Sequence, residues 1–189
     1  MNRRGFMVAA AAAGMAGSVR AQGTVGAVEV EAPSVSHNVS ALQMRDWRDF
    51  FPNLRNGAIL CDVGERALHF WSEDESTYFL FPTTVPRTDE LTRRGRTEIV
   101  RKAENPTWTT TASQRERFPD WPLQIPGGDP LNPLGVRAMY LSWPAYLLHG
   151  SHDTRKVGRR SSDGCIGMFN EHAIRLYDAT RIGTQVVLL

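Results

Sequence analysis

Residues 149–168 read HGSHDTRKVGRRSSDGCIGM and contain the most informative pair in the chain, a histidine followed 16 positions later by a cysteine. A cysteine attacks carbonyl groups as its thiolate, so at neutral pH it needs a neighbour that takes its proton. Histidine titrates in the range where it can do so. The pair His149 and Cys165 therefore predicts covalent acyl chemistry, with the histidine as base and the cysteine as nucleophile.

Glycines in this stretch favour bringing the two side chains together. Gly150, Gly158 and Gly164 permit backbone turns that other residues resist. With no side chain at position 164, the peptide N–H groups of Gly164 and Cys165 can approach a substrate closely and form an oxyanion hole. The spacing alone leaves a second interpretation open, because a free cysteine is often a small buried apolar residue.

Short motifs around the pair point to a family. They are HG at 149–150, a glycine nine residues after the histidine, SDGCIGM at 162–168, NEHAIRLY at 170–177, NPTW at 105–108, NPLG at 132–135 and GTQVVL at 183–188. Together they resemble the signature of the YkuD-type L,D-transpeptidases of the ErfK/YbiS/YcfS/YnhG kind, bacterial enzymes that cross-link the cell wall. The resemblance covers residues 57–189.

The resemblance implies a mostly β fold with short helices, a catalytic domain like a β-sandwich or barrel. It implies that Cys165 is the nucleophile, that His149 is the base, and that the carbonyl of Gly150 orients the imidazole. Gly164 and Cys165 would supply the oxyanion hole. No cofactor is implied, and the expected partners are donor and acceptor stem peptides of peptidoglycan. No nucleic-acid partner is expected, and protein partners stay unknown.

Two positions depart from the family's usual Ser-His-Gly-Cys motif, which continues with a hydrophobic residue and Arg or Asn. Asp163 stands where the histidine is usual, and Gly167 stands where Arg or Asn is usual. A carboxylate beside a thiol raises the thiol pKa unless it pairs with a cation or hydrogen-bonds elsewhere. Asp163 would otherwise orient a substrate ammonium or cap backbone N–H groups of a turn. The nearby basic residues either replace the lost arginine or form a solvated loop: Arg155, Lys156, Arg159 and Arg160.

Substrate contacts are expected from Ser162, Asp163, Arg160, His152 and Trp108. The long segment from Asn105 to Leu134 flanks the substrate groove in the resemblance. Its aromatic residues Trp108, Phe118 and Trp121 either form a wall or lid of that groove or fill a small core. The other histidines, His37, His69 and His172, are interpreted as structural or surface residues. No metal site is expected, because the His and Cys spacings do not match those of zinc sites.

The N-terminus resembles an export signal. Residues 1–21 combine paired arginines with an Ala- and Gly-rich apolar run and a small-residue cleavage site before Gln22. The arginine pair favours the twin-arginine route, although general secretory signals also begin this way. Cleavage would leave 168 residues in the periplasm with no stable membrane span. The net charge would fall from +2 to −1, because three arginines and no acids are lost. Such a balance argues against a nucleic-acid partner.

Periodicity and turn signals give a coarse layout. Residues 22–56 form an N-terminal extension, with an extended leader from Gly23 to Ser36 and one irregular helix from Asn38 to Phe51. The catalytic domain follows at 57–189. Strands are predicted at 58–63, 67–71, 78–81, 97–101, 136–141, 146–148 and 185–189, and a helix at 171–179 capped by Asn170. Cys61 and Cys165 are expected to stay unpaired, with Cys61 a small core residue.

The resemblance leaves the reaction partly open. Most family members join two diaminopimelate residues in a 3-3 bridge, whereas some join L-alanine to diaminopimelate in a 1-3 bridge. The altered residues beside Cys165 make the second type plausible. If water resolves the thioester, the same residues form an L,D-carboxypeptidase or a related hydrolase. A catalytically inactive peptidoglycan-binding module is the alternative outside enzymes.

Overall fold

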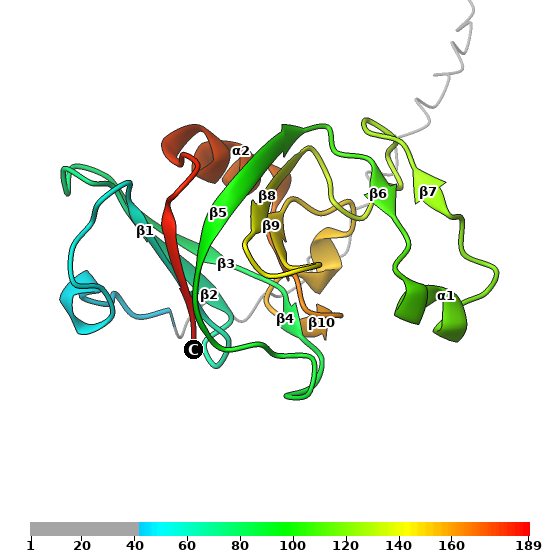
Figure 1. Ribbon diagram of the computed structural model, residues 1–189, viewed down its shortest axis with the longest axis horizontal. Coiled ribbons are helices and arrows are strands. Elements are labelled where there is room, and N and C mark those ends of the chain that lie inside the picture. Colours follow the sequence, from blue (N-terminus) through cyan, green and yellow to red (C-terminus); the bar gives the residue numbers. More distant parts are fainter. Residues whose placement is uncertain (1–41) are drawn as a thin grey trace, which may run out of the picture. The chain divides into compact units, whose positions relative to one another are not determined.

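The structure is a computed structural model that describes residues 42–189, shown as a coloured ribbon in Figure 1. The predicted export signal, the extended leader and His37 lie outside the described residues. The expectation of a mostly β fold with short helices is confirmed. Within residues 42–189, eight strands form one mixed sheet in the order β11-β9-β8-β5-β12-β1-β2-β3. Their bounds are β1 Ala58–Asp62, β2 Ala67–Trp71, β3 Tyr78–Pro82, β5 Gly95–Glu104, β8 Arg137–Leu141, β9 Leu147–His149, β11 Ile166–Gly167 and β12 Gln185–Leu188.

The first three strands form the predicted antiparallel meander. The turn before β1 uses Asn56 and Gly57 at φ values of +61° and +79°, the left-handed region that Asn and Gly tolerate best. The C-terminal β12 lies between β1, to which it is parallel, and β5, to which it is antiparallel. The first and last strands of residues 58–188 therefore lie side by side in the centre of the sheet.

Strand β5 joins the two halves of the sheet and follows a long curve in Figure 1. Its first residues pair with β12, and its second half pairs with β8 after an irregularity between Ile99 and Arg101. A β-bulge bends a strand and increases its local twist. The bend lets one strand serve two halves of the sheet, so that β8, β9 and β11 turn away from the meander. In this second half of the sheet, β9 ends with His149 and β11 begins directly after Cys165.

The core has two parts, one on each face of the sheet. The larger part includes Ile59, Phe70, Ile99, Met139 and Leu148, all fully buried. Helix α2 (Asn170–Ala179) covers it with Ala173 and Leu176. The smaller part lies on the opposite face and consists of Phe51, Leu54, Ala58, Leu60, Trp71 and Val187.

The predicted helix from Asn38 to Phe51 is wrong for the part that the structure describes. Residues 42–51 contain one 3-10 turn, η1 (Trp47–Asp49). Asp46 caps this turn by accepting the backbone N–H of Arg48, and an aspartate that binds nearby backbone competes with a continuous helix. Phe51 is instead buried against Trp71 on the sheet, with the ring centroids 6.3 Å apart.

Smaller elements lie beyond the main sheet. Strand β4 (Val85–Pro86) pairs with β10 (Arg160–Ser162), and β6 (Trp108–Thr109) pairs with β7 (Gln124–Ile125). The short helix α1 (Ala112–Arg117) lies between β6 and β7 and was not predicted. A second 3-10 turn, η2 (Thr154–Lys156), follows β9. Over residues 42–189, the structure has no helix that is both long enough and apolar enough to span a bilayer.

Both cysteines are free thiols, as predicted. Cys61 is buried in β1 with only 1% of its surface exposed, and burial raises the pKa of its thiol. In native protein at pH 9, iodoacetamide should therefore alkylate Cys165 at least about tenfold faster than Cys61, which becomes reactive only when the core opens. Peptide mass spectrometry after timed labelling measures both rates. Equal rates in native protein would contradict the core position of Cys61.

Candidate active site

The parallel pairing of β9 with β11 brings together His149, the last residue of β9, and the segment of Cys165, the residue directly before β11. Leu148 pairs with Ile166, and His149 pairs with Gly167. Leu148 and Ile166 are both buried in the core, with 0% and 1% of their surfaces exposed. Because side chains alternate along a strand, His149 and Cys165 are directed to the other face of the sheet, where both are half-buried.

Because residue 167 is a glycine, there is room for the imidazole of His149 next to β11. A Cβ atom at Gly167 would lie 3.2 Å from Cε1 of His149 and 2.9 Å from Oγ1 of Thr84. Gly167 also donates its N–H to Thr84 Oγ1 at 2.8 Å. The departure from the usual Arg or Asn thus has a local consequence, because any side chain here would crowd the histidine.

The backbone next to His149 determines which ring nitrogen is protonated. Nδ1 of His149 lies 2.5 Å from the carbonyl oxygen of Gly150, so Nδ1 carries the hydrogen and Nε2 is left as the basic atom. Burial lowers the pKa of His149 to about 4, against the opposing effect of the Gly150 carbonyl, and the charge of His152 lowers it further. The imidazole is therefore neutral at pH 7 and able to accept a proton.

The Cys165 thiol is also uncharged at neutral pH. Burial raises its pKa to about 11, Asp163 raises it as well, and the backbone N–H of Leu147 acts in the opposite direction. The thiol donates to the carbonyl of Ala145 at 3.4 Å. Ala145 has a φ of +63°, uncommon for a residue other than glycine, and this strained turn directs its carbonyl to the thiol. In the resting site the Cys165 thiol and the His149 imidazole are thus both uncharged, and the thiol donates to Ala145 and not to the imidazole.

Gly164 adopts a backbone conformation that explains why glycine precedes the cysteine. Its φ is +137°, and a Cβ atom there would lie 3.4 Å from Cζ of Tyr146. Residues with a side chain rarely adopt this φ. The N–H of Gly164 is directed to Oγ of Ser162 at 3.4 Å, a long hydrogen bond that a substrate oxygen would have to replace in an oxyanion hole.

Asp163 is held by three side chains from two other segments. Arg87 and Arg117 form ion pairs with its carboxylate, and Gln114 Nε2 donates to Oδ2 at 3.2 Å. Burial alone would raise the pKa of Asp163, but the hydrogen bonds from Arg117, Arg87 and Gln114 lower it to about 2. Of the alternatives left open above, the structure has the carboxylate paired with cations. Asp163 connects the loop before Cys165 to helix α1.

The other predicted substrate residues lie in different surroundings. Arg160 forms a 3.7 Å ion pair with Asp89. His152 follows the strand that carries His149, and burial lowers its own pKa. Trp108 is buried, with its ring 6.0 Å from that of Trp121, which stacks on Phe118 at 4.3 Å. The three aromatic rings thus pack on one another in the β6–α1–β7 segment, with Trp108 buried and Trp121 42% exposed.

Sequence reasoning missed several residues of the site. Thr84 and Ala145 carry no recognisable motif, and their roles depend on backbone geometry. Helix α1, which supplies Gln114 and Arg117, does have a signal: Thr111 and Gln114 form a capping box, spaced as such motifs require. Phe169 holds the N-cap position of α2, whereas Asn170, which was predicted to cap it, is the first residue of the helix. The side chain of Asn170 binds the loop after His149 instead.

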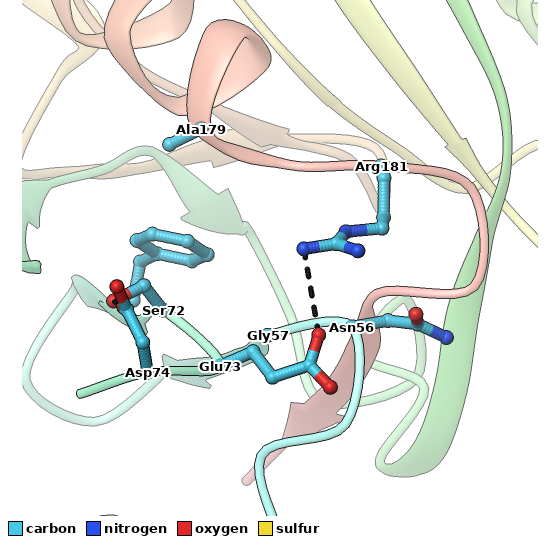
Figure 2. Close-up of a pocket in the computed structure, with 8 residues that line it drawn as sticks. Asn56, Gly57, Ser72, Glu73, Asp74, Ala179 and Arg181 are labelled. Carbon is cyan, nitrogen blue, oxygen red and sulfur yellow. Dashed lines mark hydrogen bonds and ion pairs between the residues drawn. The ribbon is translucent and has the colours of Figure 1, made fainter. Parts of the chain in front are cut away.

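His149 and Cys165 do not line the hollow that the described residues form beside the start of β1. That hollow has a volume of about 370 Å³ and is lined by Asn56, Gly57, Phe70, Ser72, Glu73, Asp74, Ala179 and Arg181. Figure 2 shows the Glu73–Arg181 ion pair, 3.4 Å long, across it. Within residues 42–189, no group of three or more His, Cys, Asp or Glu side chains is arranged to hold a metal ion.

The curled β domain has the architecture of L,D-transpeptidases of known structure. It superposes on L,D-transpeptidase 3 of Mycobacterium tuberculosis with a TM-score of 0.56 and 14% identity, over 71% of this chain and 61% of the other. The L,D-transpeptidase of Mycobacterium smegmatis gives a TM-score of 0.54 and 16% identity, over 71% and 58%. Identities this low support the shared fold.

Residues 56–188 match the L,D-transpeptidase catalytic domain family, YkuD, and this chain belongs to that family. The ORF 5 product of the ATP synthase subunits region in Fuscovulum blasticum is 50% identical over 98% of this chain and 96% of its own length. ErfK/SrfK of Escherichia coli K12 is 32% identical over 73% of this chain. Both relatives are provisionally named L,D-transpeptidases. The matched region is 46% of ErfK/SrfK, so this chain spans about half of that relative.

Two histidines with lowered pKa values predict a loss of stability in mild acid. Burial lowers the pKa of His149 and of His69 to about 4, whereas unfolded histidine titrates near 6.5. Between these values the unfolded chain binds more protons, so the free energy of unfolding should rise with pH. Urea unfolding should show a loss of more than about 1 kcal/mol between pH 7 and pH 4.5, and a smaller loss in His149→Gln. Stability that stays constant over this range would contradict the lowered pKa values of the two histidines.

The ion-paired carboxylate of Asp163 predicts a change in thiol reactivity. In Asp163→Asn the negative charge near Cys165 disappears while Arg87 and Arg117 remain, so the thiol pKa should fall. The measurement is the pH dependence of Cys165 alkylation by iodoacetamide. The matched control is Asp153→Asn, which removes a carboxylate that pairs with Arg155 in the same loop. A midpoint unchanged in Asp163→Asn, or equally shifted in both variants, would disprove the effect.

Proposed function

We propose that this chain is a periplasmic peptidoglycan L,D-transpeptidase that forms a cysteinyl thioester with a stem peptide. The observation that carries the proposal is the placement of His149 and Cys165 on one face of paired strands, with the imidazole neutral and Nε2 free. A neutral base and an uncharged thiol suit a mechanism in which the proton moves as the thiol attacks. The family membership supplies the substrate class.

The first half-reaction is acylation. As Sγ of Cys165 attacks the carbonyl of meso-diaminopimelate in the donor stem, Nε2 of His149 takes the thiol proton. The carbon–nitrogen bond to the terminal D-amino acid breaks, and the imidazolium returns the proton to the leaving amine. Gly150 stabilises the imidazolium through its carbonyl, 2.5 Å from Nδ1. The backbone N–H groups of Gly164 and Cys165 are the proposed donors to the oxyanion.

The second half-reaction is aminolysis of the thioester. An amine of the acceptor stem attacks the acyl carbon, gives its proton to His149, and forms a new amide bond. The carbon–sulfur bond breaks, and the imidazolium reprotonates the thiolate. The neutral imidazole can accept a proton from the attacking group and then release it to the leaving group at pH 7. A histidine with a pKa of about 4 holds the proton only transiently.

The amine that attacks the thioester determines which type of cross-link forms. The proposal includes both the 3-3 and the 1-3 bridge. A 3-3 bridge uses the side-chain amine of diaminopimelate, whereas a 1-3 bridge uses the amine of L-alanine. The second amine is free only in a stem detached from the glycan, because the glycan lactyl group otherwise holds it in an amide. Asp163 is already neutralised by Arg87 and Arg117, so we expect it to influence the acceptor through the loop it positions.

The periplasmic location rests on the sequence of residues 1–21, whose paired arginines and apolar run are typical of export signals. It agrees with the substrate class, since stem peptides are joined outside the cytoplasmic membrane. Detection of the processed chain, with a new N-terminus near Gln22, in a periplasmic extract would support this part of the proposal. An unprocessed cytoplasmic chain would contradict it.

The purified protein, Cys165→Ala and His149→Gln should be incubated with a disaccharide-tetrapeptide, and separately with the free tetrapeptide. We expect cross-linked dimers from the unsubstituted protein, none from Cys165→Ala, and a loss of about 10²–10⁴-fold in His149→Gln. Chromatography and fragmentation of each product identify the bridge. Dimers from both substrates indicate a 3-3 bridge, whereas dimers from the free tetrapeptide alone indicate a 1-3 bridge.

Other products would overturn the proposal in a defined way. Shortened monomers without dimers would assign the site to hydrolysis, as an L,D-carboxypeptidase. Folded protein that yields no Cys165-dependent product but retains affinity for the peptide would be a binding module. Circular dichroism of each variant establishes that a lost product reflects chemistry and not unfolding.

A further inference from the structure

Asn170 makes contacts that its place at the start of α2 does not require. Its Oδ1 accepts the backbone N–H of Ser151 at 3.2 Å and that of Val136 at 3.3 Å. It therefore joins the loop after β9 to the start of β8, although Val136 lies 34 positions away in sequence. Both partners are N–H donors, so only an acceptor atom can fill this position.

Two glycines leave the space that the Asn170 side chain occupies. A Cβ atom at Gly135 or at Gly150 would lie 2.2 Å from Oδ1 of Asn170, far inside contact distance. Gly135 also has a φ of +61°, which favours glycine. The close approach of the amide to the backbone at residues 150 and 151 thus depends on both glycines.

One of these contacts acts on the peptide unit that orients the catalytic histidine. The carbonyl of Gly150 and the N–H of Ser151 belong to the same planar peptide, and in a trans peptide they point in opposite directions. His149 Nδ1 binds the carbonyl end at 2.5 Å, and Asn170 Oδ1 binds the N–H end at 3.2 Å. Holding the N–H end fixes the direction of the carbonyl. Polarisation along such a chain also strengthens the carbonyl as an acceptor.

We propose that Asn170 is a positioning residue for the proposed reaction, acting on His149 through the Gly150–Ser151 peptide. This inference rests on the proposed role of His149 as the base. Asn170 touches neither the thiol nor the substrate. It holds the peptide so that Nδ1 keeps the hydrogen and Nε2 stays the basic atom.

Two substitutions of similar size separate this role from packing. Asn170→Asp retains an acceptor at Oδ1, whereas Asn170→Leu fills the same space and leaves the N–H groups of Ser151 and Val136 without an acceptor. We expect Asn170→Leu to lower kcat by about 10- to 100-fold with little change in KM, as for outer partners of histidines in metal sites. Asn170→Asp should keep kcat within a few-fold and raise the pKa of His149, because it adds a negative charge nearby.

The direct readout is the tautomer of His149 in the resting protein. In ¹⁵N-labelled full-length protein, with signals assigned by comparison with His149→Gln, we expect the Nδ1–H form in the unsubstituted protein and in Asn170→Asp. Asn170→Leu should give a mixture of both tautomers. A matched control is Asn132→Leu, which removes a buried amide that binds Pro106 and Leu134 in the same region but makes no hydrogen bond to residues 149–151. This control should leave the tautomer unchanged.

The tautomer readout needs no peptide substrate, so it is separate from the test of the proposed function. Unsubstituted protein that forms no cross-links would remove the proposed function and leave this readout interpretable. A pure Nδ1–H form in Asn170→Leu would overturn the positioning role. If Asn170→Leu does not fold, Asn170→Asp decides: a higher ¹⁵N-monitored pKa of His149 supports the proposal, and an unchanged pKa overturns it.

Discussion

The parallel pairing of β9 with β11 is the constraint on which the site depends. Leu148 and Ile166 are paired and buried in the same core, which fixes the register of two strands that are far apart in sequence. A slip of one residue would exchange the buried and exposed sides of a strand and direct His149 or Cys165 into the core. Hydrophobic burial of two aliphatic side chains therefore determines that the two reactive side chains share a face.

The surroundings of the pair then determine its charge. Burial favours the uncharged form of both groups. It raises the pKa of the Cys165 thiol and lowers the pKa of the His149 imidazole. Asp163, two residues before Cys165, is kept ionised by Arg87 and Arg117, which belong to two other segments of the chain. The usual histidine of the family motif is thus replaced by an anion whose charge is largely balanced. The arrangement suits a thiol that is activated only when a substrate arrives.

The sequence predicted the features that depend on local pattern. The meander of β1, β2 and β3 follows from short apolar runs and the Asn56–Gly57 turn, and the fold class follows from the family motifs. The partners of Asp163 were not predictable, because Arg87 lies 76 positions away and the contact forms only after folding. The role of Asn170 was missed for the same reason, since its predicted helix-cap position suggested a local partner. Helix α1 was missed although Thr111 and Gln114 signal its start.

The proposed reaction requires that Cys165 carries an acyl group between its two half-reactions. Acid quenching during incubation with the tetrapeptide, followed by mass spectrometry of the whole protein and of its peptides, tests it most directly. We expect an added mass equal to the donor without its terminal D-amino acid, located on Cys165 and released by hydroxylamine. Product formation by folded protein without such an adduct at early times, or an adduct on another residue, would contradict it.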